Sequence, residues 1–402
     1  MLSEESLELI VQDHLAELEW QAGHGPDFAP GSGERDTWND IVLRGRLRNA
    51  VRNLNPGVPE EYLDQAIGEV ITPKSQSAIA ENRRIHQILV EGYRGIEYID
   101  HEGNIQNPTI YFLSSQPHKN DYLSLNQVTI ANLDGERRFD VVCYVNGMPL
   151  AFIELKKTGA NTSVEGAYNQ LQTYVKEFGM AFRFANIVIP SDDISAKYGT
   201  PFTPWNHFAP WNVDEDGSPV DPNNMVVAGE PVTQLDLLLD GLFNVERFGQ
   251  LYSDFTAFDD TAEGLVMRIA KPHQYFAVTK AVGSTITAAR GDKRAGVIWH
   301  TTGAGKSMEM ELYTAKIMRR TEMHSPTVIV LNDRTELDEQ LFETFNRSTI
   351  LPEAPRNIES RAELRELLSQ KTSGGIYFST LQKFGLNGKG ELREKEHPLL
   401  SD

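Results

Sequence analysis

A glycine-rich loop in the C-terminal half constrains the possible folds of this chain more than any other segment. The loop spans residues 300–307, reads His-Thr-Thr-Gly-Ala-Gly-Lys-Ser, and follows the apolar run Val-Ile-Trp at 297–299. Its glycines let the backbone turn so that N–H groups face phosphate oxygens. Its lysine supplies a cation, and its serine hydroxyl reaches Mg²⁺ at a helix N-terminus. A strand, this loop and a helix in succession predict an α/β fold with a phosphate-binding site.

Apolar segments of strand length alternate with helical patterns around this loop. The expected elements are a strand at 295–299, a helix at 307–320, a strand at 327–331, a helix at 336–345 and a strand at 375–379. This alternation is typical of a parallel sheet with helices on both faces. We predict a domain boundary near residue 255, which separates an N-terminal domain (1–255) from an α/β domain (256–402).

The N-terminal domain has a different pattern, with helices before and after a group of strands. Ser3 is a plausible N-cap for an amphipathic helix over 3–20. The other expected elements are helices near 59–67 and 76–91, strands with turns over 94–155, a helix opened by Thr162 and running to about Glu177, a strand at 182–190, a Pro- and aromatic-rich insertion at 191–232, and a helix with a connection over 233–258.

Three charged side chains of the N-terminal domain form a candidate metal site. Glu154 and Lys156 lie two residues apart on a strongly apolar strand and therefore point to one face, and Asp140 lies on the preceding strand. A Mg²⁺ ion that polarises a phosphate needs hard oxygen ligands, and a nearby amine stabilises charge or orients the attacking water. Because this strand looks buried, an unpaired carboxylate on it would be costly, which favours a functional role over a solvated surface.

The turn between these two strands decides whether Asp140 shares a face with Glu154. An Asn-Gly pair at 146–147 normally signals a two-residue hairpin loop, and that register pairs Asp140 with Ile153, on the opposite face. A three-residue loop with the glycine as a left-handed bulge shifts the pairing by one residue and restores the shared face. A shared metal site therefore requires an odd loop or a bulge.

The next predicted helix carries Gln170 and Tyr174, four residues apart on one face. Together with the aspartate, the glutamate and the lysine of the hairpin, this block resembles the PD-(D/E)xK nucleases, in particular the RecB-like branch with its Gln-x-x-x-Tyr motif. The resemblance implies that the aspartate and glutamate bind Mg²⁺ and that the lysine assists catalysis. It also implies an upstream helical glutamate as a further metal ligand, and Glu8 matches it best. The implied catalytic residues are Asp140, Glu154, Lys156, Gln170 and Tyr174, and the implied metal ligands are Glu8, Asp140 and Glu154.

Segments on either side of the glycine-rich loop resemble the motor motifs of superfamily 2 helicases. In these helicases the loop has the sequence Thr-Gly-x-Gly-Lys-Ser. Here His300 occupies the position of the first glycine in the strict pattern. Residues 271–278 resemble the adenine-reading Q motif, 328–340 resemble motif Ia, and 377–384 resemble the next DNA-contacting segment. The resemblance implies a RecA-like lobe. Its implied ATP-binding residues are Gln274, Thr302, Gly303, Gly305, Lys306 and Ser307.

The order of the two blocks resembles the R subunit of type I restriction-modification enzymes over essentially the whole chain. That resemblance implies Mg²⁺-dependent cleavage of unmodified double-stranded DNA away from the recognition site, after ATP-driven translocation. It also implies partner modification (M) and specificity (S) subunits. No Asp-Glu-Ala-His box follows the motor segments before residue 402. We therefore expect a fragment of a longer subunit that binds ATP weakly and does not hydrolyse it.

Composition narrows the class of protein further. The net charge of −19 argues against simple coating of DNA, because phosphate binding depends on Lys and Arg, and it suggests that a partner recognises the DNA sequence. The single cysteine excludes a disulfide framework and a cysteine-based zinc site. The N-terminus lacks a signal-peptide pattern, and no apolar run approaches the roughly 18 residues of a membrane span. We expect a cytoplasmic protein that does not enter a membrane.

Two other functions are compatible with the same motifs. One is another nuclease–helicase fusion, such as a repair enzyme or a type III restriction subunit, although type III chains place the nuclease after the motor. The other is a non-catalytic, ATP-gated module for DNA binding or assembly. Mg²⁺-dependent nicking separates the enzymes from the module, and co-purification with a methyltransferase pair separates type I from other fusions.

Overall fold

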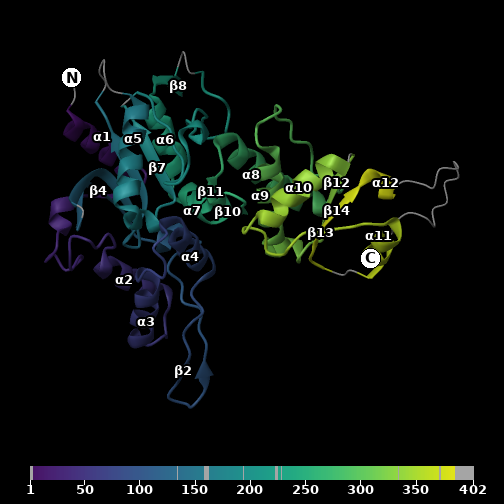
Figure 1. Ribbon diagram of the computed structural model, residues 1–402, viewed down its shortest axis with the longest axis horizontal. Coiled ribbons are helices and arrows are strands. Elements are labelled where there is room, and N and C mark those ends of the chain that lie inside the picture. Colours follow the sequence, from purple (N-terminus) through teal and green to yellow (C-terminus); the bar gives the residue numbers. More distant parts are fainter. Residues whose placement is uncertain are drawn as a thin grey trace. The chain divides into compact units, whose positions relative to one another are not determined.

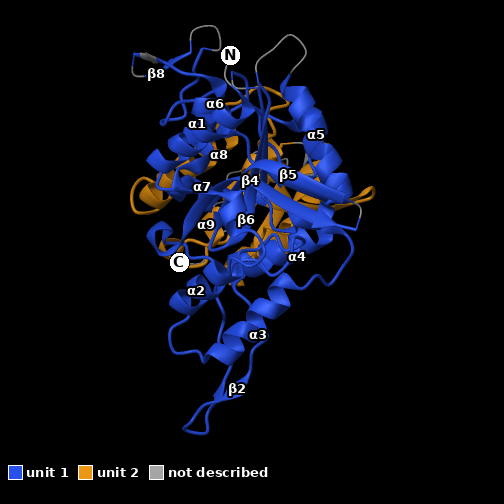
Figure 2. Ribbon diagram, turned by 90° about the vertical axis from the view of Figure 1, so that its left-hand side faces the viewer, with its two compact units in different colours: residues 1–256, 265–272 blue, residues 257–264, 273–402 orange. Residues whose placement is uncertain are grey.

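The computed structural model describes residues 3–133, 135–157, 163–192, 194–221, 225–227, 229–333, 335–370 and 373–384. The chain divides into two compact units (Figures 1 and 2). The first comprises residues 1–256 and 265–272, and the second comprises 257–264 and 273–402. The division lies at Thr256, where strands β10 (Thr256–Thr261) and β11 (Gly264–Ile269) form a two-stranded sheet.

A five-stranded mixed sheet lies in the first unit, in the order β1-β4-β5-β6-β7. Its strands β4, β5 and β6 are labelled in Figure 2. Its strands are β1 (Gln21–His24), β4 (Tyr122–Asn132), β5 (Gly135–Val145), β6 (Met148–Leu155) and β7 (Ile187–Ser191). The pairs β1–β4 and β6–β7 are parallel, and β4–β5 and β5–β6 are antiparallel. Every residue of β6 is buried, so the strand is covered on both faces. The expected strand at 182–190 is shorter, because 3₁₀ helix η3 (Gly179–Arg183) occupies its first part.

Seven α-helices of the described part of the first unit flank or extend this sheet. They are α1 (Glu4–Glu17), α2 (Arg44–Leu54), α3 (Glu60–Ile71), α4 (Ala78–Glu91), α5 (Val164–Glu177), α6 (Gln234–Phe243) and α7 (Val245–Asp254). The Ser3 cap is confirmed, because its side chain accepts from the N–H of Ser6. Ser163 caps α5, not Thr162, which lies outside the described residues. Helix α2 has no counterpart in the expected elements, because four arginines interrupt its short apolar stripe.

Smaller elements complete the first unit. They are η1 (Gly25–Phe28), β2 (Tyr98–Ile99), β3 (Ile105–Gln106), η2 (Pro117–Lys119), η4 (Trp205–His207), β8 (Val226–Val227) and β9 (Glu230–Pro231). The strands pair as β2–β3 and β8–β9. In the aromatic-rich insertion, Tyr198 and Trp211 are buried, so aromatic side chains anchor this loop.

The β5–β6 hairpin combines a two-residue turn with a bulge. Asn146 and Gly147 have positive φ values of 52° and 76°, as a type I′ turn requires. The register is Val145 with Met148 at the turn, but beyond it the register shifts by one residue. An extra residue of β6, Leu150, has no partner on β5 at the shift, and its carbonyl accepts from the N–H of Asn186. The hairpin therefore contains the bulge that a shared metal site requires, in the strand and not in the turn.

The bulge moves the predicted carboxylates level with each other. Beyond it, Val141 pairs with Ile153, so the next position along the two strands places Asp140 beside Glu154. The Asn-Gly turn alone would have paired Asp140 with Ile153. One inserted residue thus decides the composition of the site.

Helix α1 is held against α6 by a histidine. The Nε2 atom of His14 lies 2.7 Å from Oδ1 of Asp240, and its Nδ1 atom lies 3.7 Å from Oδ1 of Asp236. The carboxylates of Asp236 and then Asp240 raise the pKa of His14 to about 9, although burial opposes the shift. The pair matters for the site because α1 also carries Glu8.

We predict that His14 makes the first unit less stable at alkaline pH. Its contribution is complete below the pKa of an unfolded histidine, about 6.5, and is lost as the pH rises through the folded value. The contribution is on the order of 1–3 kcal/mol, because solvent screens the partly exposed aspartates. Urea unfolding from about pH 6 to about pH 10 measures it. His14→Gln should flatten this part of the profile, and an unchanged slope in that variant would refute the assignment.

The second unit contains a parallel three-stranded sheet in the order β12-β14-β13. Its strands are β12 (Val328–Asn332), β13 (Arg356–Asn357) and β14 (Ile376–Thr380), and its helices are α8 (Pro272–Ala289), α9 (Lys306–Met318), α10 (Thr335–Arg347), α11 (Arg361–Gln370) and α12 (Leu381–Phe384), with a 3₁₀ turn η5 (Thr321–Met323). Helices α9 and α10 and strands β12 and β14 confirm the predicted alternation.

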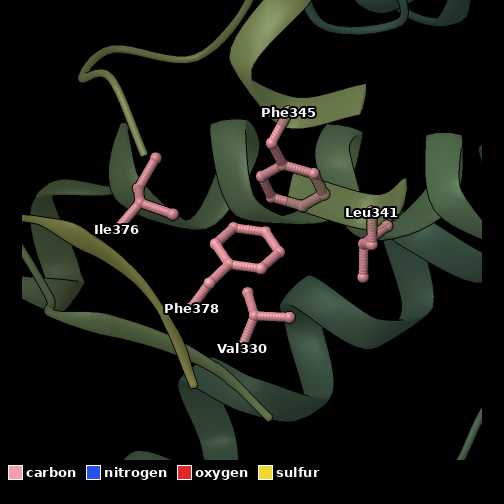
Figure 3. Close-up of a cluster of buried hydrophobic side chains, with 5 residues drawn as sticks. All are labelled: Val330, Leu341, Phe345, Ile376 and Phe378. Atoms are coloured by element: carbon pink, nitrogen blue, oxygen red, sulfur yellow. The ribbon is translucent and has the colours of Figure 1, made fainter. Parts of the chain in front are cut away.

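Apolar side chains cover both faces of this sheet. On one face, Val330 and Phe378 pack against Phe345 of α10 (Figure 3). On the other, Tyr377 packs against Leu364 and its neighbours on α11. Alternate residues of β14 thus contact helices on opposite sides, which confirms a parallel sheet with helices on both faces.

The expected strand at 295–299 is not formed in this structure. The segment has no regular secondary structure, and Val297 and Trp299 are 88% and 90% exposed. An apolar run becomes a strand only where a neighbouring strand supplies hydrogen bonds, and none of β12, β13 and β14 pairs with this segment. The prediction of a strand before the glycine-rich loop is therefore wrong here.

No described helix combines the length and the apolar character that a membrane crossing needs.

Candidate functional site

Helix α1 brings Glu8 to the sheet of the first unit. The helix packs against β4, β5 and β6. Glu8 is 3% exposed, and within the described structure its Oε2 atom has no hydrogen-bond partner. A buried carboxylate oxygen without a donor is costly, so this position favours a cation or a proton near it.

The hairpin supplies the other charged groups. The N–H of Leu155 donates to Oδ2 of Asp140 over 2.7 Å, and Nζ of Lys156 donates to Oε1 of Glu154 over 2.9 Å. Glu154 is 1% exposed, whereas Asp140 is half-buried. The ammonium group therefore neutralises only part of the acidic charge in this corner of the sheet.

Burial raises the pKa of all three carboxyl groups, and repulsion adds to the shifts of Glu8 and Glu154. Burial raises the pKa of Glu8 to about 7 and that of Glu154 to about 8, and the charge of Asp140 adds to both. The pKa of Asp140 is also raised by burial, although the Leu155 N–H opposes the shift. Burial lowers the pKa of Lys156, but the charge and hydrogen bond of Glu154 outweigh it and raise the value. Such a group of acids binds a divalent cation at low cost, because the cation replaces the protons.

The predicted residues of α5 lie beside this group. Gln170 donates from Nε2 to the hydroxyl of Tyr174. Tyr174 packs edge-on against Phe139, with ring centroids 5.2 Å apart. Burial raises the pKa of Tyr174, and the negative charge of Glu154 contributes next. The fold therefore brings Glu8, Asp140, Glu154, Lys156, Gln170 and Tyr174 into one neighbourhood.

The three carboxylates do not form the tightest potential metal group among the described residues. The one group of three whose ligand atoms all lie within 4.8 Å of one another is His273, His300 and Glu309, in the second unit. Sequence reasoning also missed Gln127 of β4, whose side chain lies close enough to Glu8 to oppose the rise in that group's pKa caused by burial. The alternating pattern of β4 does not distinguish it from an ordinary strand residue.

The glycine-rich loop adopts left-handed turns at both glycines. Gly303 and Gly305 have φ values of 85° and 84°, and Gly305 is the N-cap of α9. Nζ of Lys306 donates to the carbonyls of His300 and Thr301 over 3.1 and 2.9 Å. Thr302, Lys306 and Ser307 are exposed. The loop thus presents the positive end of a 13-residue helix and a cation to solvent, as an anion site requires.

The start of α8 holds this loop in place. Nε2 of Gln274 donates to the carbonyls of Ala304 and Gly305 over 3.3 and 3.4 Å, and Nε2 of His273 lies 2.8 Å from the Ala304 carbonyl. A side chain at Gly305 would collide with Gln274. Gln274 is 4% exposed, so in this structure it supports the loop. Its adenine-reading role stays a prediction.

A buried carboxylate on α9 contacts two histidines near the loop. Nδ1 of His300 lies 2.7 Å from Oε1 of Glu309, and Nε2 of His273 lies 3.9 Å from the same oxygen. Two histidines and one carboxylate are a set typical of zinc, not of the Mg²⁺ that a nucleotide carries. Their atoms already pair with one another or with the loop, so the set ties the loop to α9.

We predict that removing His300 loosens α9. His300→Ala leaves the 2% exposed carboxylate of Glu309 without its closest partner, which should cost about 1–3 kcal/mol. Amide hydrogen exchange of α9 measures this loss. Glu343→Gln, at a surface pair of α10, is the matched control and should change little. Equal exchange in both variants would contradict a supporting role of His300.

Comparisons with known proteins agree with this division. A family profile for the type I restriction enzyme R protein N terminus matches residues 1–207, and a profile for the SWI2/SNF2 ATPase matches residues 273–402. The whole chain is 33% identical to the type I restriction enzyme HindI endonuclease subunit of Haemophilus influenzae. Over 96% of the chain it is 32% identical to the putative type I restriction enzyme MjaIXP endonuclease subunit of Methanocaldococcus jannaschii. A third relative, the SauCOLORF180P endonuclease subunit of Staphylococcus aureus, is 25% identical over 57% of the chain.

These relatives are much longer than the present chain. The chain spans 38% of the HindI subunit, 37% of the MjaIXP subunit and 22% of the SauCOLORF180P subunit. The similarity to the first two relatives covers all or nearly all of the chain and therefore extends across both units.

Proposed function

The chain belongs to the family of type I restriction enzyme R proteins, and from that premise we propose that it cleaves unmodified double-stranded DNA as part of a larger ATP-driven enzyme. The first unit is the PD-(D/E)xK endonuclease, of the RecB-like branch. The second is the first RecA-like lobe of a superfamily 2 translocase. Cleavage takes place away from the recognition site, after translocation, in the cytoplasm.

The observation that carries the nuclease proposal is the group of buried acids around one lysine. The orphaned Oε2 of Glu8 and the raised pKa of Glu154 fit a Mg²⁺ site, because hard oxygens are its preferred ligands. Glu8, Asp140 and Glu154 would hold the ion, which polarises the scissile phosphate when bound. Lys156 stabilises negative charge beside Glu154, and Gln170 orients the hydroxyl of Tyr174.

The glycine-rich loop supports the motor half of the proposal. Gly303 and Gly305 shape the turn, and Lys306, at the first position of α9, would contact the β- and γ-phosphates of ATP. The hydroxyls of Thr302 and Ser307 would complete the phosphate and Mg²⁺ contacts. Gln274 would turn from the loop to the adenine.

The partners follow from the same family. We propose M and S subunits, which supply methylation and sequence recognition. The net charge of −19 fits this division, because a chain so acidic gains little affinity from general phosphate contacts.

Reconstitution tests the proposal. The longer subunit that contains this chain, assembled with its M and S subunits, should cut an unmethylated plasmid only with both Mg²⁺ and ATP. Methylated plasmid is the control and should stay intact. Cleavage that needs neither ATP nor the partner subunits would reject a type I enzyme in favour of a simpler nuclease. Absence of Mg²⁺-dependent cleavage in the full assembly would favour a non-catalytic module.

A further inference from the structure

Gln127 has an unusual backbone for a residue inside a strand. Six described residues other than glycine have positive φ values, namely Glu19, Gln127, Asn146, Lys293, His324 and Ser325. Of these six, Gln127 alone lies within a strand that continues on both sides of it, and its φ is 52°. Such conformations persist only where the surrounding structure enforces them, and they cluster at functional sites.

Gln127 lies at the same level of the sheet as the proposed catalytic carboxylates. The β4–β5 register pairs Asn126 with Val141 and Val128 with Phe139. Gln127 therefore lies level with Asp140, which the bulge of the next strand has placed beside Glu154.

A glycine in the neighbouring turn allows this conformation. A Cβ atom at Gly25 would come within 2.5 Å of the carbonyl oxygen of Asn126 and 2.6 Å of that of Gln127. The adjacent His24 pairs with Asn126 in the parallel β1–β4 ladder, and Nδ1 of His24 lies 2.9 Å from Oδ1 of Asn126. Contacts from β1 and η1 thus hold both peptide groups around the left-handed residue.

The side chain of Gln127 reaches the acidic group from this backbone. Burial raises the pKa of Glu8, and the nearby side chain of Gln127 opposes that shift. The buried Oε2 atom of Glu8 has no hydrogen-bond partner among the described residues. Glycine would adopt the left-handed conformation without strain. What glutamine adds at this position is a side-chain amide beside the Glu8 carboxylate.

We propose that Gln127 is a positioning residue that holds the Glu8 carboxylate beside Asp140, so that a divalent cation meets oxygens already in place. This inference rests on the proposed nuclease function of the same site. Partners that orient metal ligands typically change metal affinity by about 10- to 100-fold when they are removed.

The substitution Gln127→Gly tests the role with little risk to folding. It keeps the left-handed backbone and removes only the amide. Titration of the 402-residue chain with Mn²⁺ should show affinity about 10- to 100-fold weaker, with an unchanged or higher urea midpoint. In the assembled enzyme, the Mg²⁺ concentration for half-maximal cleavage should rise, and saturating Mg²⁺ should restore the rate. A purely structural residue would not produce this separation.

Glu19→Gly is the matched control. Glu19 is an exposed residue of the first unit that follows α1, and its φ is 72°. Glycine at this position relieves the same kind of backbone strain as glycine at position 127. It should bind Mn²⁺ like the wild type. Wild-type Mn²⁺ affinity in Gln127→Gly would overturn the positioning role. If Glu154→Gln also kept both Mn²⁺ affinity and cleavage, the nuclease proposal itself would fail, so the two failures are distinguishable.

Discussion

Glu154→Gln in the assembled enzyme should reduce DNA cleavage by about 10²-fold or more, which is the typical cost of removing one preorganised catalytic group. Glu154→Ala should lose at least as much, because it also removes the partner of Lys156. Neither variant should change ATP hydrolysis, since the glycine-rich loop lies in the other unit. Plasmid linearisation and phosphate release, measured on the same preparations, give both values.

The same substitution should stabilise the metal-free first unit at neutral pH. The pKa of Glu154 is raised to about 8 in the folded chain, so ionisation opposes folding once the pH exceeds the ordinary value of about 4.5. Glutamine cannot ionise, so this penalty is absent in the variant. A gain in stability with a loss of cleavage is the signature of a residue retained for function.

Glu136→Gln is the control for the hairpin. Glu136 is an exposed carboxylate of β5, four residues before Asp140. It should cut DNA like the wild type. Wild-type cleavage by Glu154→Ala would show that the acidic group is structural and that the nuclease centre lies elsewhere.

Lys306→Ala should abolish both ATP hydrolysis and double-strand cleavage in the assembled enzyme. The lysine is the one cation of the glycine-rich loop, and its ammonium group is exposed at the start of α9. Its loss removes phosphate binding and therefore translocation. Cleavage depends on translocation in the proposed enzyme, because a stalled motor holds DNA near the nuclease. The residue itself takes no part in phosphodiester chemistry.

Two measurements separate this coupling from misfolding. Mn²⁺ affinity of Lys306→Ala should equal that of the wild type, because the acidic group belongs to the first unit. Arg290→Ala, which removes another exposed cation of the second unit, should leave ATP hydrolysis intact. If Lys306→Ala cuts DNA normally without ATP turnover, the two units are neighbours in sequence only, and the motor-driven mechanism is wrong.

Local sequence patterns predicted much of the architecture, because helix periodicity, caps and glycine turns act over a few residues. The Ser3 cap, α9, α10, β12 and β14 follow this rule. The 295–299 segment does not follow this rule. Its apolar residues have strand propensity, but a strand also needs a neighbour, and the described sheet supplies none.

The sequence by itself determined which residues are candidates for the chemistry, because a carboxylate, a lysine and a Gly-x-Gly-Lys-Ser loop are defined by residue type and spacing. Only the tertiary structure decided how they meet. The Asn-Gly turn by itself predicts a register that pairs Asp140 with Ile153, and the extra residue Leu150 shifts that register by one residue. The Leu150 carbonyl accepts a hydrogen bond from the N–H of Asn186, a contact between distant residues that no local pattern encodes. The left-handed Gln127 is likewise held by contacts from β1 and η1, about a hundred residues earlier in the chain. Long-range contacts therefore bring together candidate residues that the sequence alone identifies, and they add Gln127, which the sequence does not reveal.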